Sequence, residues 1–391
     1  MREAYIIDSV RTAGCKAKKG KFKDMRPDDL ATSAIKGLIQ KTGVNPDDVE
    51  DVILGCAFPE AEQGMNVARI VVMNAGLPYT VPGQTVNRFC SSGLQSIAIA
   101  CESIISGSAD CIIAGGTESM TMVPMIGNTF RANPVLIEKW PESYISMGLT
   151  AELVAEKYNI SREKQDEFAF NSHQKAAKAI DADKFKDEII PVEIENKVLV
   201  NGRIQTKKEI VDIDDGVRKD TSIESLSKLR PAFKTSGGVT AGNSSQMTDG
   251  AAAALVVSED FLKKTGLKPS LKFRSFAVKG VPPEIMGIGP IEAIPAALKR
   301  AGLTLNDIGL IELNEAFASQ SLAIIKTLDL NTDIINVNGG AIALGHPLGC
   351  TGAKLTATLK HEMKRNKIKY GIVSMCIGGG MGACGVFENI N

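Results

Sequence analysis

The chain has 391 residues, of which 44% are hydrophobic, and its 45 basic residues are balanced by 45 acidic ones. This length exceeds a usual single core, so we expect two or three domains of a globular α/β enzyme. Zero net charge gives no reason to expect nucleic acid or an anionic membrane as a partner. No apolar run approaches the ~18 residues of a membrane span.

The cysteines and the first residues indicate the compartment. Eight cysteines occur without any C-x-x-C pair, and only three histidines are present. None of the histidines has ligand spacing from a cysteine, so we expect reduced thiols and no metal site. The strand-like run Tyr5–Ile7 begins too early to leave room for a signal peptide, and the sequence therefore predicts a cytoplasmic protein.

The first predicted elements recur later in the chain. An amphipathic helix after Pro27 ends at Gly43, and a short strand follows at 52–54. The same order returns 259 residues further on, with a helix after Pro290 that ends at Gly302. The strand that follows the second helix is 310–313. The constant shift predicts two copies of one mixed α/β unit with buried sheets.

A long segment between the two copies has no counterpart. It spans 118–248, includes a helix capped by Ser161, and is long enough to serve as a lid or binding region. The chain then re-enters the first unit at 249–257, which is interpreted as a helix followed by a strand. The predicted domains are an N-terminal domain (1–117 and 249–268), a loop domain (118–248) and a C-terminal domain (269–391).

Cys90 is the first candidate for chemistry. It begins a helix whose apolar stripe starts only at Leu94. Because Ser91 and Ser92 are polar, we expect the first turn to take no part in core packing. A thiol there gains acidity from the helix dipole, and free N–H groups point toward its acyl adduct. Cys101 and Cys111 instead fall on buried positions and are interpreted as core.

His346 and Cys376 complete the candidate set. His346 lies in a turn rich in glycine and proline, where a side chain can be aimed, whereas His173 and His361 are interpreted as solvated surface residues. Cys376 ends a buried strand, and the glycines at 378–380 could present amides to an oxyanion. A nucleophile, a base and amide donors are what acyl transfer through a thioester requires.

One glycine pattern is misleading. Residues 380–385 satisfy G-x-G-x-x-G, but a dinucleotide site needs a helix, a second strand and an acidic residue about 20 positions later. Only six residues follow Gly385. We therefore do not expect a dehydrogenase.

Over essentially its whole length the chain resembles the thiolase family. The resemblance rests on the motif segments 87–93, 338–349 and 376–382, and on 241–245 and 314–317. It implies two duplicated α/β/α/β/α domains that form a five-layered core, plus an inserted loop domain that holds coenzyme A. It also implies a homodimer or homotetramer.

The resemblance further implies ping-pong chemistry with coenzyme A as co-substrate and no bound cofactor. His346 takes the proton of Cys90, which becomes acylated as acetyl-CoA leaves. Cys376 protonates the departing α-carbon and later deprotonates the incoming thiol. Asn314 holds a water that, with His346, forms one oxyanion hole, and the amides of Cys90 and Gly378 form the other.

Family matching also implies the residues that contact coenzyme A. They are Arg218 at the adenine, Ser245 at the pantetheine amide, and along the tunnel Phe233, Ala241, Ala316, Phe317 and Met147. Arg218 is equally well interpreted as a solvated residue of a charged loop.

Two alternatives stay open. Ser146, where short-chain biosynthetic thiolases typically have histidine, favours a degradative or broad-chain 3-ketoacyl-CoA thiolase, whereas the glycine run 378–380 resembles an acetoacetyl-CoA thiolase that condenses two acetyl-CoA. The other alternative is a catalytically inactive, thiolase-like acyl-CoA-binding protein. It is expected to have lost Cys90, His346 or Cys376, and all three are present.

Overall fold

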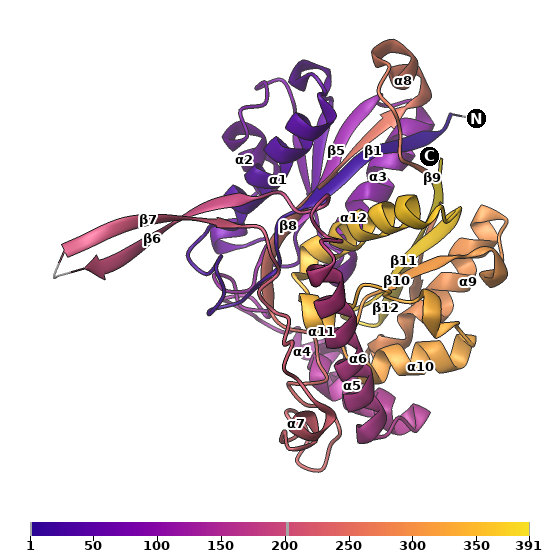
Figure 1. Ribbon diagram of the computed structural model, residues 1–391. Coiled ribbons are helices and arrows are strands. Elements are labelled where there is room, and N and C mark those ends of the chain that lie inside the picture. The colour runs from indigo at the N-terminus through magenta and orange to yellow at the C-terminus, as the bar shows by residue number, and fades with distance from the viewer. Residues whose placement is uncertain (1, 201–202, 391) are drawn as a thin grey trace.

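The computed structural model describes residues 2–200 and 203–390 (Figure 1). The strands of its large sheet are β1 Ala4–Arg11, β2 Cys15–Lys16, β3 Asp51–Gly55, β4 Gly83–Val86, β5 Cys111–Ser119, β8 Thr248–Ser258, β9 Leu271–Gly280, β10 Leu310–Leu313, β11 Tyr370–Ile377 and β12 Met381–Asn389. Their order is β10-β11-β12-β9-β1-β8-β5-β3-β4, with β2 paired to β8.

The helices outside the inserted segment are α1 Pro27–Thr42, α2 Val67–Asn74, α3 Ser92–Ser106, α8 Glu259–Thr265, α9 Gly289–Ala301, α10 Ala318–Leu328, α11 Ala341–Leu344 and α12 Leu348–Asn366. The inserted segment contributes α4 Pro134–Lys139, α5 Met147–Tyr158, α6 Arg162–Asp181, α7 Ile223–Ser227 and the hairpin of β6 Val192–Val200 and β7 Arg203–Val211. Short 3-10 turns are η1 Pro46–Asp48, η2 Ala61–Gln63, η3 Phe89–Ser91, η4 Pro141–Tyr144, η5 Pro283–Ile288, η6 Leu305–Asp307 and η7 Thr332–Ile334.

The large sheet consists of two halves with the same pattern. In the first half, β3 runs parallel to β4 and β5, and β8 runs antiparallel to β5 and β1. In the second half, β10 runs parallel to β11, and β12 runs antiparallel to β11 and β9. A parallel bridge between Ile311 and Ile335 stands where β4 lies in the first half. The halves meet where β1 pairs with β9.

The duplicated elements form as the sequence predicts. α1 ends at Gly43 and α9 at Gly302, both with φ of 69°. Glycine stops a helix in this left-handed conformation without the penalty of a Cβ atom. A 3-10 turn follows each helix, η1 in the first copy and η6 in the second. The prediction of a repeat is confirmed.

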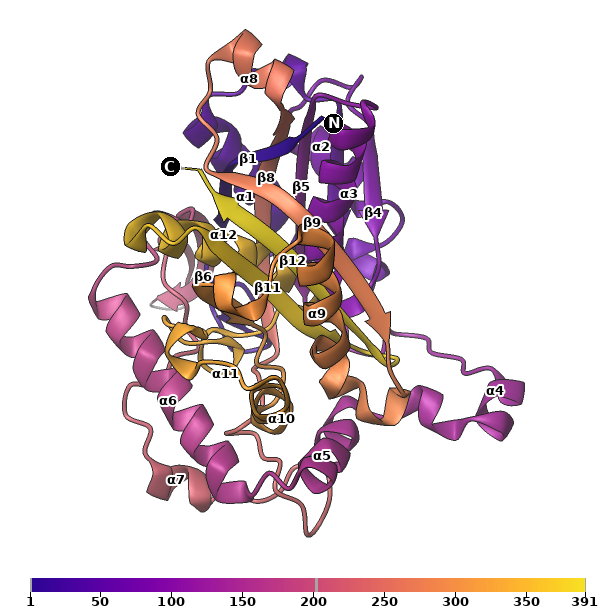
Figure 2. The same ribbon diagram turned by 90° about the vertical axis from the view of Figure 1, so that its right-hand side faces the viewer.

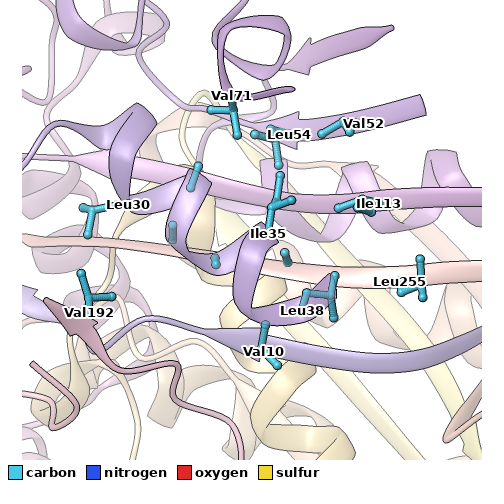
Figure 3. Close-up of a cluster of buried hydrophobic side chains, with 14 of the residues drawn as sticks. Val10, Leu30, Ile35, Leu38, Val52, Leu54, Val71, Ile113, Val192 and Leu255 are labelled. Carbon is cyan, nitrogen blue, oxygen red and sulfur yellow. The ribbon is translucent and has the colours of Figure 1, made fainter. Parts of the chain in front are cut away.

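Three apolar clusters alternate with the two halves of the sheet. Figure 3 shows the first, where side chains of α1, including Ile35 and Leu38, pack on strands of the first half. The second lies between the halves, around α3 and α12, and the third packs α9 and α10 on the second half. The layers are therefore α/β/α/β/α, as expected of the five-layered core.

The central helix α3 belongs to a stretch that is apolar enough to span a membrane but is mostly buried inside the protein. Within the described residues, Phe89–Ser106 is the one helical stretch with suitable length and mean hydropathy, which is 1.2. The expectation that no apolar run approaches that length was wrong. Because 67% of the stretch is buried inside the protein, it is a core helix.

The inserted segment leaves after β5 and returns in β8, and these two strands are antiparallel neighbours. In the second half the corresponding strands β11 and β12 are joined by a short turn at 378–380. The inserted helices α5 and α6 lie at one end of the core, and the β6–β7 hairpin projects from it (Figures 1 and 2). Ser161 caps α6 as predicted, because its hydroxyl accepts from the backbone N of Lys164. The domain boundaries stay a prediction.

Two segments that bear on expected helices, 249–257 and the residues after Gly380, are strands. The helix predicted at the start of 249–257 is wrong, since β8 is a strand over its whole length. Its small residues allow a close approach: a Cβ on Gly115 would lie 2.0 Å from the backbone oxygen of Ala252 on β8. After Gly380 the chain continues as the strand β12, not as the helix that a dinucleotide site requires.

The helix α12 is buried on all sides because it lies between the two halves of the sheet. His361 is 8% exposed, so the prediction that it is solvated was wrong. Burial, with neighbouring Lys360, lowers the pKa of His361 to about 3. An apolar stripe on one face does not show that the opposite face is wet when a helix forms a middle layer.

Candidate active site

Cys90 lies in η3, immediately before α3. The preceding residue, Phe89, has a φ of 42°, an uncommon conformation for a residue other than glycine and typical of functional sites. Cys90 is 8% exposed. Burial raises the pKa of its thiol to about 12, although hydrogen bonds from the backbone amides of Gly378 and of Cys90 itself act in the opposite direction. Burial therefore favours the protonated thiol, contrary to the expected dipole-stabilised thiolate.

The polar residues after Cys90 shape its turn. Ser91 and Ser92 are both fully buried. The expectation that the first turn makes no packing contacts was therefore wrong. The hydroxyl of Ser92 donates to the oxygen of Phe89 at 2.7 Å and accepts from the nitrogen of Arg88 at 2.9 Å. These bonds close the chain around Cys90 and hold its position.

Cys376 lies near the carboxyl end of β11, and it is fully buried. Burial raises the pKa of its thiol, and the neighbouring Cys90 raises it further. The amide of Gly378, two residues on, reaches Cys90. Two thiols from the two halves therefore meet, and the amide of Gly378 donates to one of them, Cys90.

His346 is held by its backbone and by its ring. Its N–H donates to the carbonyl of Gln246 and to the hydroxyl of Thr248, both at 3.1 Å. Its Nδ1 lies 2.5 Å from the hydroxyl oxygen of Thr351 on α12. Burial, aided by Lys354, lowers the pKa of the imidazole to about 3, so the ring is neutral.

Asn314 follows β10, which runs parallel to the strand of Cys376, so both residues lie at one edge of the sheet. Its Nδ2 lies 3.3 Å from Nε2 of His346. Its Oδ1 is buried and has no hydrogen-bond partner among the residues that the structure describes. A buried oxygen of this kind usually binds water or ligand, which agrees with a water site at Asn314.

Glu118 is a residue that sequence reasoning missed. It is fully buried on β5, and its Oε2 accepts from the nitrogens of Ala57 at 2.8 Å and Gly349 at 2.7 Å. Burial raises the pKa of its carboxyl group. Glu118 thus ties the turn after His346 to a loop of the first half. A lone acidic residue at the end of a strand that begins as a buried apolar run is the signal that could have found it.

The residues expected to line a coenzyme A tunnel are partly assembled. Ala316, Phe317 and Met147 share one apolar cluster with Cys376. Ser245 joins it through its backbone, because its N–H donates to the oxygen of Ala316 at 2.9 Å. Within the described ranges, no three His, Cys, Asp or Glu side chains are placed to hold a metal ion.

The other residues expected to contact coenzyme A lie nearer the surface of the protein. The ring of Phe233 is 42% exposed and meets that of Phe317 edge-on, with 6.1 Å between centroids. Ala241 and Arg218 are exposed. The backbone N–H of Arg218 donates to Nδ1 of His173 at 3.2 Å. His173 is 3% exposed, so the prediction that it is solvated was wrong: the segment around Arg218 covers it.

A duplicated five-layered α/β fold that brings together a buried cysteine from each half and also contains a buried histidine is suited to thiol chemistry. Models of the thiolase N-terminal domain and the thiolase C-terminal domain match residues 4–260 and 267–389. The chain belongs to the thiolase family.

Relatives cover the whole chain. It is 58% identical over 389 residues to the 3-ketoacyl-CoA thiolase of Bacillus subtilis (strain 168), which covers 99% of this chain and 100% of the relative. It is 48% identical over 392 residues to the peroxisomal 3-ketoacyl-CoA thiolase 1 of Arabidopsis thaliana, covering 99% and 87%.

Solved structures agree. The human mitochondrial 3-ketoacyl-CoA thiolase superposes with a TM-score of 0.90 at 39% identity, and the Bacillus anthracis acetyl-CoA acetyltransferase with 0.91 at 38% identity. Each comparison covers 100% of this chain and 99% of the other.

Proposed function

We propose that this thiolase cleaves 3-ketoacyl-CoA with coenzyme A, giving acetyl-CoA and a shortened acyl-CoA through a thioester on Cys90. The observation that carries the proposal is the meeting of Cys90 and Cys376 beside the amide of Gly378. Acyl transfer between two thiols needs one sulfur that accepts the acyl group and one group that moves the carbon-bound proton. The names of the relatives support this substrate class.

The first half-reaction starts from a neutral pair. Because the pKa of Cys90 is raised to about 12 and that of His346 lowered to about 3, a resting thiolate–imidazolium pair is unfavourable. Proton transfer to His346 therefore accompanies attack of Cys90 sulfur on the 3-keto carbonyl. The bond between the α- and β-carbons breaks, Cys376 donates its proton to the α-carbon, and acetyl-CoA leaves.

The second half-reaction returns both protons. The Cys376 thiolate takes the proton of the incoming coenzyme A thiol, whose sulfur attacks the acyl group on Cys90. The Cys90 sulfur leaves and regains its proton from His346, so each group ends as it began. In the reverse direction Cys376 removes a proton from the α-carbon of acetyl-CoA.

Charge on the two carbonyl oxygens needs donors. The Gly378 and Cys90 amides already point at the Cys90 sulfur, which supports a role for them as one oxyanion hole. Asn314 beside Nε2 of His346 supports the second, with a water on the asparagine. Loss of one such donor typically costs about 2.7–4 kcal/mol of barrier.

The same geometry supports a binding path for coenzyme A. Met147, Ala316 and Phe317 give its pantetheine arm an apolar wall that ends at Cys376. Ser245 is half-buried beside that wall, with Phe233 and Ala241 nearer the solvent. The exposed position of Arg218 suits a contact with the nucleotide end.

The experiment is acylation of the resting enzyme. Incubation with acetyl-CoA adds one acetyl group, and mass spectrometry of the digested protein places it on the Cys90 peptide. His346→Gln slows the reaction, and Cys90→Ser abolishes the cysteine thioester. Label on Cys376 or Cys350 in the wild type would overturn the assignment of the nucleophile.

An acetyl-CoA C-acetyltransferase, working mainly in condensation, is the second candidate. Similarity to the B. anthracis acetyl-CoA acetyltransferase favours it, as does the glycine run 378–380. The higher identity to a 3-ketoacyl-CoA thiolase and the presence of Ser146 favour the degradative function.

We also propose a cytoplasmic homo-oligomer. All eight cysteines are free thiols, as a reducing compartment maintains them. The edge strand β4 lies near two strongly exposed apolar side chains, Met65 and Tyr79, which are 91% and 84% exposed. Such an edge is normally covered in the working protein. Sedimentation velocity distinguishes a monomer from a dimer or tetramer.

A further inference from the structure

We infer that Thr351 is a positioning residue that keeps the proton of the neutral His346 ring on Nδ1 and leaves Nε2 unprotonated, as the base. The inference rests on the proposed function, in which His346 accepts the proton of Cys90. Thr351 is 1% exposed in the first turn of α12. Its hydroxyl oxygen lies 2.5 Å from Nδ1 of His346 and 3.1 Å from the carbonyl oxygen of Pro347.

The hydroxyl has one proton, and its partners compete for it. Because the oxygen of Pro347 is only an acceptor, donation to it leaves the Thr351 oxygen as an acceptor toward the ring. Nδ1 must then carry the hydrogen. On the other side of the ring, the Nδ2 group of Asn314 is a donor and faces Nε2 at 3.3 Å. Only with the proton on Nδ1 are all three contacts hydrogen bonds.

The other tautomer breaks this set. With the proton on Nε2, two donors, Nε2–H and the Nδ2 group of Asn314, would face each other. The unprotonated Nδ1 would then accept the hydroxyl proton of Thr351, and the bond from this hydroxyl to Pro347 would be lost. A protonated Nε2 would also be unable to accept the proton of Cys90 in the proposed function. In the working tautomer the Nδ1–H bond persists after Nε2 gains its proton, so Thr351 holds the ring through the whole step.

The backbone that carries the ring is held in place. The backbone that leads into His346 is fixed, by Thr248 at the nitrogen of His346 and by the buried ammonium of Lys354 at the carbonyl oxygens of Leu344 (2.8 Å) and Gly345 (3.0 Å). Gly345 has a φ of 82°, which suits glycine at this turn. With the backbone held, the contacts of the ring with Thr351 and Asn314 decide which ring nitrogen carries the proton.

The same helix provides a matched control. Thr356 is fully buried, and its hydroxyl donates to the carbonyl four residues earlier, that of Gly352, at 2.8 Å. Thr351 makes the same kind of bond to Pro347. Thr356→Val thus removes an equivalent buried hydroxyl without touching the imidazole, whereas Thr351→Val removes the ring partner. Thr351→Ser retains it.

The test reads the tautomer directly. In protein with ¹⁵N-labelled histidine rings, the wild-type His346 signal should show a protonated Nδ1 and a bare Nε2 at neutral pH. The signals of His173 and His361 are assigned from their Gln variants. Thr351→Val should shift the His346 populations toward protonated Nε2, while Thr351→Ser and Thr356→Val keep the wild-type pattern.

Kinetics give the second readout. Thr351→Val should slow acetylation of Cys90 by about tenfold, the usual effect of one lost hydrogen bond to the ring, with KM for acetyl-CoA unchanged. Thr351→Ser should restore the rate. A protonated Nε2 in the wild type, which needs no variant to fold, overturns the inference, as does equal slowing by Thr351→Val and Thr356→Val. Wild-type acetylation away from Cys90 would instead overturn the proposed function, while the ring spectrum would still test the tautomer.

Discussion

Gly93 on α3 and Gly352 on α12 occupy equivalent positions in the two copies of the repeat and face each other's helices at the centre of the molecule. A Cβ on Gly352 would lie 2.3 Å from the backbone nitrogen of Leu94, and one on Gly93 would lie 2.9 Å from that of Ala353. The two helices thus pack backbone to backbone. The contact fixes the distance between the turn of Cys90 and the turn of His346.

Gly352→Ala should therefore separate the helices, because the clash is with backbone and not with a flexible side chain. We expect a loss of about 1–3 kcal/mol of unfolding free energy and slower acetylation of Cys90. Calorimetry and the acetylation assay measure the two effects. Gly280→Ala is the control, since the nearest atom to its Cβ lies at 3.9 Å. Equal behaviour of the two variants would show that the close packing does not matter.

The sequence was a good guide wherever local rules decide structure. The two helices ending at Gly43 and Gly302, and the shift of 259 residues, indicated the duplicated architecture before any coordinates. Asn314 and the coenzyme A contacts were implied only by the resemblance to the thiolase family, whereas Cys90, His346 and Cys376 could be named because a helix start, a turn and a strand end mark them. Their state of ionisation could not be predicted: the helix start at Cys90 suggested a thiolate, but burial outweighs the dipole.

Contacts between layers lie beyond such rules. Glu118 reaches the turn after His346 across 231 residues of chain, and no local pattern reports that. His361 was misplaced for the same reason, because α12 has protein on every side. Thr351 is only five residues from His346, yet its role depends on which ring nitrogen of His346 faces its hydroxyl group. Tertiary packing decides each case.

Cys376→Ala should separate the roles of the two thiols. Cys90 of the variant should still be acetylated by acetyl-CoA, at a reduced rate, because Cys376 does not form the thioester. Exchange of the acetyl-CoA α-protons with deuterated solvent should be lost, since Cys376 is the group proposed to remove them. Mass spectrometry and proton NMR measure the two processes. Exchange at the wild-type rate would assign that proton to another base.

Alkylation of Cys90 by iodoacetamide should rise about tenfold per pH unit between pH 7 and pH 10, without a plateau. Only the thiolate reacts, and a pKa of about 12 keeps its fraction small and proportional to hydroxide. Labelling of the Cys90 peptide is followed by mass spectrometry. A plateau below pH 9 would mean that the resting site stabilises the thiolate.

Stability should fall above about pH 8.5, the ordinary pKa of cysteine. Burial raises the pKa of each of the eight thiols, namely Cys15, Cys56, Cys90, Cys101, Cys111, Cys350, Cys376 and Cys384. The folded protein then keeps protons that the unfolded chain releases, so stability present below pH 8.5 is lost as pH rises. Three lysines whose pKa values are lowered by burial, Lys16, Lys354 and Lys360, oppose this loss, as three groups against eight.

Urea unfolding at pH 7.5 and pH 10 measures that loss. Cys101→Ala is the informative variant, because Cys101 is fully buried in α3 and has no part in the proposed chemistry. It should lower stability at both pH values, as a core truncation does, but narrow the difference between them. A difference as large as that of the wild type would mean that the buried thiol does not contribute to the pH dependence.

Chain length should distinguish the two candidate functions. Ser146 precedes Met147 at the start of α5, and Met147 packs with Cys376. A Cβ on Gly378 would lie 3.5 Å from the sulfur of Met147. A serine at 146 leaves free the volume that an imidazole would fill. If an acyl chain enters there, each buried methylene contributes up to about 0.8 kcal/mol, reduced by the entropy of ordering the chain.

We therefore expect kcat/KM for thiolysis to rise from C4 to at least C8 3-ketoacyl-CoA substrates, by up to several-fold per two carbons. Ser146→His should depress the longer substrates more than acetoacetyl-CoA, because the imidazole refills the space near Met147. Ser143→His, three residues earlier in the turn η4, is the control and should leave the profile unchanged. Steady-state thiolysis across C4 to C16 measures the profile. A wild-type enzyme that cleaves only C4 would identify the acetyl-CoA C-acetyltransferase as the correct function, and the glycine run after Cys376 as the better guide than Ser146.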